Sequence, residues 1–119
     1  MESICKLRRM FSAVYKLERD IKKRFGVTAN EIMILCLLNA LDLSAGELSK
    51  EIGVSGSRLS KVINSLEKGG YIVRRIDDKD KRKMIFSITS KGKRKVEEFA
   101  ESKLEVPDID IEKISNLIC

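Results

Sequence analysis

The chain has 119 residues and a mass of 13.5 kDa, which is the size of a single domain. Hydrophobic residues make up 43% and charged residues 35%, while aromatic residues reach only 5%, a composition typical of a helical protein with a charged surface. The absence of histidine excludes a Ser-His-Asp triad, a Cys-His pair and a histidine metal site within one chain. We therefore expect a protein that is not an enzyme and that needs no cofactor or metal.

The net charge of +6 is unevenly distributed along the chain. Residues 1–49 hold 8 basic and 6 acidic side chains, residues 50–95 hold 14 and 5, and residues 96–119 hold 2 and 7. The middle segment therefore carries +9 and the C-terminal segment −5. Such a concentration predicts a polyanionic partner that binds the middle segment, although chance clustering on a solvated face would produce the same count.

The three cysteines, Cys5, Cys36 and Cys119, are odd in number and widely spaced, which indicates reduced thiols and a cytoplasmic protein. Cys36 falls in an apolar stretch and is expected to be a small core residue. Charges interrupt the first twenty residues too often for a signal peptide. The longest apolar run, residues 32–41, is much shorter than the ~20 residues that span a bilayer, so no membrane association is expected.

The first half of the chain predicts two long helices. Apolar residues recur with a period near 3.6 over residues 4–25, which indicates an amphipathic helix, and Gly26 suits its C-terminal end. Thr28 and Glu31 have the spacing of a capping box. The helix that they open is apolar almost all round, so we expect it to be the central helix of the core.

A helix-turn-helix pattern follows. Ser44 and Glu47 form a second capping box, which opens a short helix over residues 45–52. After the turn Gly53-Val54-Ser55, a second helix is predicted over residues 55–68, with an apolar stripe and a Gly-Gly stop. Two short helices joined by a three-residue turn are typical of this motif.

The period then changes to that of strands. Residues 71–76 and 83–89 alternate and are rich in β-branched side chains, and a charged stretch separates them. These features predict a β-hairpin with a charged tip.

Another helix is expected to begin at Thr89 or Ser90, and the isoleucines after Pro107 predict a short terminal helix over residues 109–118. No internal repeat is present, so residues 1–119 are interpreted as one domain.

A helix-turn-helix followed directly by a basic hairpin is the order of a winged helix. Residues 48–75, LSKEIGVSGSRLSKVINSLEKGGYIVRR, resemble the helix-turn-helix of MarR-type bacterial transcription regulators. Residues 80–92, DKRKMIFSITSKG, resemble that family's wing signature, an arginine at the tip followed seven residues later by threonine in Ile-Thr-x-x-Gly. The resemblance implies a mainly α (α+β) winged helix-turn-helix with a two-stranded wing. Residues 28–89 would form its DNA-binding core, and helices within residues 1–25 and 90–119 would form the dimerisation region.

The resemblance also implies a function. We expect a homodimeric repressor that reads a pseudo-palindromic operator in double-stranded DNA, although the sequence does not distinguish repression from activation. The alternative is a winged-helix module for protein interaction or assembly without specific DNA binding. RNA binding is a weaker alternative, because the chain lacks an aromatic stacking platform. Many relatives bind small aromatic anions between their dimerisation and DNA-binding regions, but no residue of this sequence identifies such an effector.

Candidate DNA contacts lie on the second helix of the motif. In residues 55–68, the positions that do not belong to the apolar stripe form a second face of short polar and basic side chains. Such a face suits a helix that lies in the major groove. Arg58 and Lys61 are candidates for guanine or phosphate contacts, and the serines for phosphate oxygens, although capping and solubility would also explain the serines. The predicted contacts are Ser55, Ser57, Arg58, Ser60, Lys61 and Asn64.

The hairpin supplies a second group of candidates. By the resemblance, Arg82 matches the wing arginine that enters the minor groove, and Asp80 matches the acid that braces it. The lysines nearby would attract phosphates, and the alternative is an ordinary charged turn. The predicted wing contacts are Arg74, Arg75, Lys79, Asp80, Lys81, Arg82 and Lys83.

Two further expectations concern the termini. Some relatives sense oxidants through a cysteine of the first helix, and Cys5, which cationic residues follow, is a candidate redox thiol. The isoleucine-rich tail is too short to fold alone, so it must cover an apolar surface of a partner subunit or of its own domain.

Overall fold

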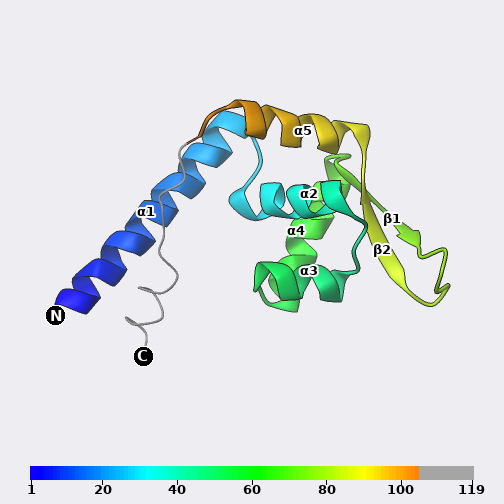
Figure 1. Ribbon diagram of the computed structural model, residues 1–119, viewed down its shortest axis with the longest axis horizontal. Coiled ribbons are helices and arrows are strands. Elements are labelled where there is room, and N and C mark those ends of the chain that lie inside the picture. The colour runs from blue at the N-terminus through cyan, green and yellow to red at the C-terminus, as the bar shows by residue number, and fades with distance from the viewer. Residues whose placement is uncertain (105–119) are drawn as a thin grey trace.

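The computed structural model describes residues 1–104, which form five helices and one two-stranded antiparallel sheet (Figure 1). The order of elements and the α+β winged-helix class predicted from the sequence are confirmed. The expected terminal helix over residues 109–118, part of the proposed C-terminal dimerisation region, lies outside the described residues. The elements are α1 (Glu2–Phe25), α2 (Ala29–Ala40), α3 (Ala45–Ile52), α4 (Gly56–Lys68), β1 (Ile72–Ile76), β2 (Met84–Ile88) and α5 (Ser90–Glu101).

Local side-chain chemistry fixes where the first helices begin and end. The Thr28 hydroxyl accepts from the Glu31 amide at 3.1 Å, and the Glu31 carboxylate accepts from the Thr28 amide at 2.9 Å. Ser44 and Glu47 form the same reciprocal pair at the start of α3. α1 ends at Gly26, whose φ of 75° suits a residue without a side chain. Both predicted capping boxes are therefore confirmed.

Helix α2 is the centre of the core. It packs against α5 on one side and against α3, α4 and β2 on the others, and Figure 1 shows α5 and α4 on opposite sides of it. Ile34 and Leu35 are fully buried. The rings of Phe25 and Phe99 meet with centroids 5.2 Å apart, and this contact joins the end of α1 to α5.

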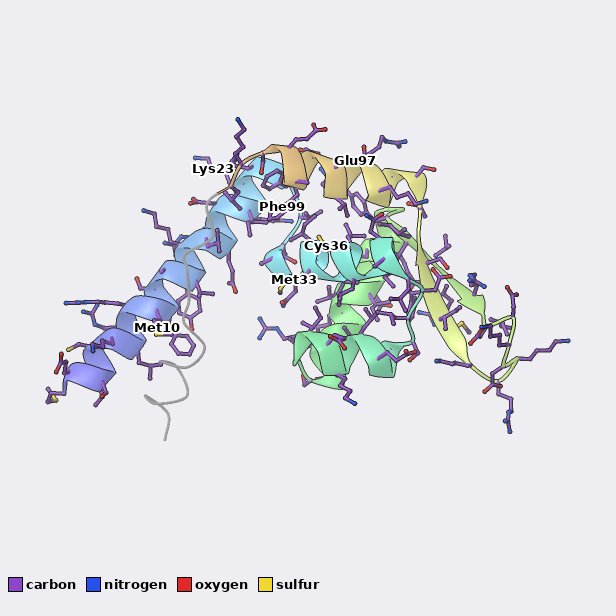
Figure 2. The ribbon with its side chains drawn as sticks, viewed as in Figure 1. Met10, Lys23, Met33, Cys36, Glu97 and Phe99 are labelled. Carbon is purple, nitrogen blue, oxygen red and sulfur yellow. The ribbon has the colours of Figure 1, made fainter. Side chains whose placement is uncertain are left out.

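One face of α2 differs from the prediction. Cys36 was expected in the core, but it is exposed, and Met33 on the same side is 43% exposed (Figure 2). Neighbouring atoms still desolvate the Cys36 thiol, and this partial burial raises its pKa. A helix that is apolar all round does not show in its sequence which face the rest of the chain leaves open.

The base of the wing is joined to the body by backbone hydrogen bonds. β1 pairs antiparallel with β2, from Ile72 opposite Ile88 to Ile76 opposite Met84. β2 also exchanges two hydrogen bonds with the α2–α3 connection, where the Phe86 amide donates to the Leu43 carbonyl at 2.8 Å and the Phe86 carbonyl accepts the reverse bond at 3.4 Å. The base is therefore fixed, while the tip projects away from the helices (Figure 1).

Helix α1 projects from the opposite side of the molecule (Figure 1). Its buried residues, Ile21 and Phe25, lie at its C-terminal end. Toward the N-terminus the apolar residues Ile4, Phe11 and Tyr15 are 65%, 51% and 53% exposed. Within residues 1–104 no helix has the length and apolar content needed to cross a membrane.

The glycine of the Thr-x-x-Gly segment is explained by close packing. Thr89 caps α5 by accepting from the Gly92 amide at 3.2 Å, and its hydroxyl donates to the Gly70 carbonyl at 2.6 Å. A Cβ atom on Gly92 would lie 2.4 Å from the Tyr71 carbonyl oxygen and 2.6 Å from a side-chain carbon of Ile88. Only glycine fits at this junction of wing and α5.

We therefore expect Gly92→Ala to lower the free energy of unfolding by about 1–3 kcal/mol, because the new methyl group overpacks the junction. Gly46→Ala is the matched control, since its Cβ would have nothing within 4 Å, and it should raise the free energy of unfolding by up to ~1 kcal/mol. Urea unfolding of the two variants and the wild type measures both changes. If Gly92→Ala instead raised the free energy of unfolding, the close contact of Gly92 with Tyr71 and Ile88 would be contradicted.

Candidate nucleic-acid interface

Helix α4 presents the face that the sequence predicted. The turn before it contains Gly53 at φ 80°, and the Ser49 hydroxyl donates to the Val54 carbonyl at 2.8 Å, which holds the turn closed. Leu59, Ile63 and Leu66 are buried against the core. The opposite face is open to solvent, and all six predicted residues on it are exposed: Ser55, Ser57, Arg58, Ser60, Lys61 and Asn64.

The serines and the cations of this face differ in their partners. Ser55 caps α4 by accepting from the Arg58 amide at 3.3 Å, and the Ser60 hydroxyl donates to the Gly56 carbonyl at 3.0 Å. The first bond agrees with the capping interpretation of Ser55, whereas the Ser60 bond is a contact within the helix to the carbonyl four residues earlier. Within residues 1–104, neither the Arg58 guanidinium nor the Lys61 ammonium forms an ion pair. The two cations are therefore available to an external anion.

A buried carboxylate sets the position of α4. Glu31 is only 6% exposed, and besides its capping bond it accepts from the Ser65 hydroxyl of α4 at 3.1 Å. The sequence pattern identified Glu31 as a capping residue only. Its second contact was missed, because nothing in the spacing of Glu31 and Ser65 indicates that they meet.

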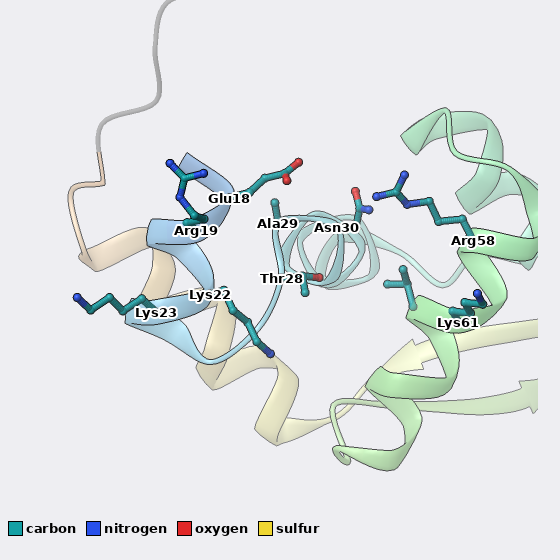
Figure 3. Close-up of a pocket in the computed structure, with 10 residues that line it drawn as sticks. Glu18, Arg19, Lys22, Lys23, Thr28, Ala29, Asn30, Arg58 and Lys61 are labelled. Atoms are coloured by element: carbon teal, nitrogen blue, oxygen red, sulfur yellow. The ribbon is translucent and has the colours of Figure 1, made fainter. Parts of the chain in front are cut away.

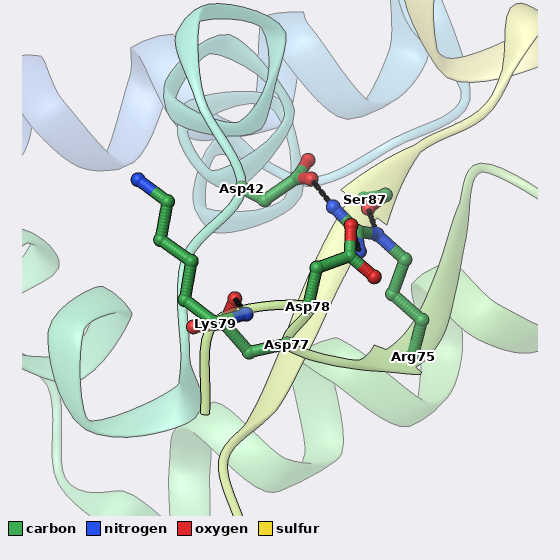
Figure 4. A network of polar contacts seen from close by, with 6 residues as sticks. All are labelled: Asp42, Arg75, Asp77, Asp78, Lys79 and Ser87. Carbon is green, nitrogen blue, oxygen red and sulfur yellow. Dashed lines mark hydrogen bonds and ion pairs between the residues drawn. The ribbon is translucent and has the colours of Figure 1, made fainter. Parts of the chain in front are cut away.

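Arg75, one of the predicted wing contacts, turns back toward the body. Its guanidinium donates to the Asp42 carboxylate and, through Nε at 2.8 Å, to the Ser87 hydroxyl, and it lies 3.6 Å from Asp78 (Figure 4). The hydrogen bond with Asp42 is the main cause that raises the pKa of Arg75. This contact joins β1 to the α2–α3 connection.

Two more wing cations are paired in the same way. Lys83 lies 2.8 Å from a carboxylate oxygen of Glu47 in α3, and Arg74 donates to both carboxylate oxygens of Glu67 in α4, at 2.7 and 3.2 Å. The hydrogen bond from Lys83, followed by those from Ser44, lowers the pKa of Glu47 to about 2. The pKa values of Lys83 and Arg74 are raised by their acidic partners.

These pairs change the interpretation of the wing. Arg74, Arg75 and Lys83 were predicted as DNA contacts, but each is close to an acid that cancels much of its charge. Their observed contacts hold the wing against the α2–α3 connection, α3 and α4. Asp42 and Glu47 lie more than 30 residues before their partners Arg75 and Lys83 in the sequence, so the sequence pattern did not indicate these two pairs.

The tip of the wing keeps its charge exposed. The Arg82 side chain is 94% exposed, with Nε 3.5 Å from an Asp80 oxygen that also accepts from the Arg82 amide at 3.1 Å. This is the bracing arrangement expected for the pair, although such an exposed ion pair contributes little stability. Lys79 and Lys81 form no ion pair within the described part of the chain.

Comparison with known proteins identifies the family. The MarR family model matches residues 25–83, from the last residue of α1 to the end of the wing tip. The chain belongs to the MarR family. This is a family of transcriptional regulators and not of enzymes.

Individual relatives agree with this MarR assignment. The transcriptional repressor YetL of Bacillus subtilis is 34% identical over 77 residues, which cover 62% of this chain and 46% of YetL, so the chain spans about half the length of that relative. The regulator BldR of Sulfolobus solfataricus has the same fold, with a TM-score of 0.75, 23% identity and coverage of 99% of this chain and 91% of BldR. The structure of MepR of S. aureus with DNA has a TM-score of 0.64, 27% identity and 81% coverage of each chain.

The remaining site expectations for this MarR-family chain concern metals and thiols. Within residues 1–104 no three His, Cys, Asp or Glu side chains are grouped so that they could hold a metal ion. Cys5 is an exposed, unpaired thiol near the start of α1. Its redox role stays a prediction.

The contribution of the Glu47–Lys83 pair to folding stability can be tested by its dependence on pH. Because the folded-state pKa of Glu47 is about 2, below its ordinary 4.5, the pair stabilises the fold above about pH 4.5, and this contribution is lost as the pH falls toward 2. We expect Glu47→Gln to be less stable than the wild type at about pH 6, and the difference to shrink on acidification to about pH 3. Urea unfolding midpoints at several pH values measure it.

The control is Glu51→Gln, an exposed acid of the same helix that has no ion pair within the described residues. It should not reduce stability at about pH 6. A Glu47→Gln effect of the same size at every pH would mean that packing or capping, and not the charge of Glu47, causes the loss.

Proposed function

We propose that this chain is a sequence-specific, double-stranded DNA-binding transcriptional regulator that acts in the cytoplasm as a homodimeric repressor. The observation that carries the proposal is the exposed face of α4, on which Arg58 and Lys61 have no acidic partner within residues 1–104. α4 lies in the major groove and the wing tip in the flanking minor groove.

The chemistry of each region suits its groove. Arg58 sits in the first turn of α4, where its guanidinium reaches base edges and recognises guanine by two hydrogen bonds. Ser57 and Lys61 contact phosphates beside it. The Arg82 side chain is exposed at the wing tip beside Asp80, and a guanidinium there can enter a minor groove. The structure of MepR with DNA supports the proposal, since the two chains share a fold over 81% of each and MepR was captured on DNA.

The homodimer explains the exposed apolar side of α1. Ile4, Phe11 and Tyr15 are uncovered in the single chain, and a second copy that pairs along α1 would bury them. We propose that residues 1–25 and 90–119 form this dimerisation region. A two-fold dimer reads a pseudo-palindromic operator with half-sites about 34–36 Å apart. No effector ligand is part of the proposal.

The test of DNA recognition uses fluorescence anisotropy with the DNA upstream of the chain's own gene and with a random duplex, each over a salt titration. Arg82→Ala should weaken binding to both DNAs and reduce the salt slope by roughly 0.9 for each phosphate that the variant no longer neutralises. Arg58→Ala should also relax the preference at one base pair, at a cost of about 1–3 kcal/mol. Arg94→Ala on the exposed side of α5 is the control.

The outcomes separate the alternatives. Equal wild-type affinity for both DNAs would reduce the function to non-specific binding. An affinity that does not fall with salt would favour the protein-interaction module instead. Unchanged low-salt affinity of Arg82→Ala would refute the role of the wing tip.

The dimer has its own test. Phe11→Asp puts a charge on the exposed apolar side of α1, so the variant should sediment as a monomer at concentrations where the wild type is a dimer. Analytical ultracentrifugation measures the change. Lys16→Asp, an exposed substitution on the same helix, should leave the dimer intact. A wild type that is monomeric at all concentrations would contradict the proposed dimer.

A further inference from the structure

A second concentration of unpaired positive charge lies outside the helix-turn-helix. A cleft of about 620 Å³ opens between the C-terminal part of α1, the N-terminal end of α2 and the first turns of α4. Figure 3 shows α1 on one side of the cleft, α4 on the other, and α2 end-on between them. Its cationic lining residues are Arg19, Lys22 and Lys23 from α1 and Arg58 and Lys61 from α4.

Basic side chains outnumber acidic ones around the cleft. Five basic side chains line it against one acidic side chain, Glu18. Figure 3 shows the Glu18 carboxylate directed into the cleft, whereas the charged ends of Arg19 and Lys23 point away from it. Within residues 1–104 none of the five forms an ion pair, in contrast to four of the wing cations, Arg74, Arg75, Arg82 and Lys83. Lys22 donates to the Gly26 carbonyl at 3.1 Å, a contact that leaves its charge intact.

The N-terminal end of α2 forms the third wall of the cleft. The Thr28 hydroxyl and the Glu31 carboxylate already accept hydrogen bonds at this end, so they offset its partial positive charge. Asn30, which also lines the cleft, is a neutral hydrogen-bond donor. The walls formed by α1 and α4 therefore supply the positive charge, and α2 supplies a neutral donor.

We propose that this cleft binds the sugar-phosphate backbone of the operator, so that the α1–α2 corner forms a third DNA contact region beside α4 and the wing tip. The proposal rests on the DNA-binding function proposed above and extends it to residues outside the helix-turn-helix and wing. Lys22 is its central residue on α1, and Arg19, whose guanidinium points away from the cleft in Figure 3, adds positive charge beside it.

Continuity with the α4 face favours DNA over a small anion. Arg58 and Lys61 belong to both the cleft and the exposed face of α4, so a strand that follows α4 continues into the cleft. The wing and α1 lie on opposite sides of α4 in Figure 1, and a duplex placed across α4 meets both. DNA carries one charge per about 1.7 Å of its axis, which matches several cations in one cleft better than a single small anion does.

The test is the double variant Arg19→Gln/Lys22→Gln. Gln at position 22 keeps an amide that can donate to Gly26. The control is Lys93→Gln/Arg94→Gln, which removes the same charge from exposed positions of α5, on the other side of α2 from α4. Sedimentation first establishes that both variants keep the wild-type oligomeric state.

Binding of the upstream DNA is then measured by anisotropy over a salt titration, followed by hydroxyl-radical footprinting. The cleft variant should bind about tenfold more weakly at low salt, with a salt slope smaller by roughly 0.9 for each phosphate that a protomer no longer neutralises. Its footprint should lose protection at the sugars next to the α4 contacts and keep the protection in the wing-contacted groove. The control should match the wild type.

The possible failures are distinct. If the wild type does not bind DNA with a salt-dependent affinity, the proposed function fails. If the wild type binds and the cleft variant matches the control in slope and footprint, DNA binding stands and the backbone contact is refuted, which leaves the cleft to a small anion.

Discussion

The arrangement of the DNA-binding face depends on one buried carboxylate. Glu31 accepts hydrogen bonds from the Thr28 amide and the Ser65 hydroxyl, so one side chain both begins the central helix and positions α4 against it. A buried carboxylate without such donors would be strongly unfavourable, and each of its two oxygens accepts one of these bonds. The same end of α2 is a wall of the basic cleft and follows directly from α1. Glu31 thus joins α4 to the end of α2 beside the cleft, while the pairs of Arg74, Arg75 and Lys83 hold the wing.

The contrast between net and unpaired charge is the main functional point. By sequence, residues 50–95 hold most of the positive charge, and the wing holds much of it. In the folded chain, Asp42, Glu47 and Glu67 pair with three wing cations. Within residues 1–104, the cations without an ion pair include Arg58 and Lys61 on α4, Lys79 and Lys81 at the wing tip, and Arg19 and Lys22 on α1. Acidic residues therefore act as positioning groups, which fix the angle of the wing and limit non-specific attraction to polyanions.

Local rules explain which features were predictable from the sequence. The capping boxes at Thr28 and Ser44 and the stop at Gly26 involve neighbours in sequence, so their spacing was sufficient. The exposed face of α4 followed from its apolar stripe. The Arg75–Asp42 pair joins residues 33 positions apart, and no periodicity reports such a contact. Cys36 was placed in the core because α2 is apolar on all sides, and only the packing of the other elements shows that its face stays open.

Because α1 projects from the body, a small rotation at its C-terminal end produces a large displacement at its N-terminal end in the proposed dimer. A helix of 24 residues is about 36 Å long, and it is joined to the DNA-binding part through the short segment at Gly26. A rotation of about 5° at that joint displaces the far end by roughly 3 Å, which is close to the rise of one base pair. The packing of Ile21 and Phe25 at this end of α1, including the contact of Phe25 with Phe99 of α5, therefore limits how far the spacing of two half-sites can vary in the proposed dimer.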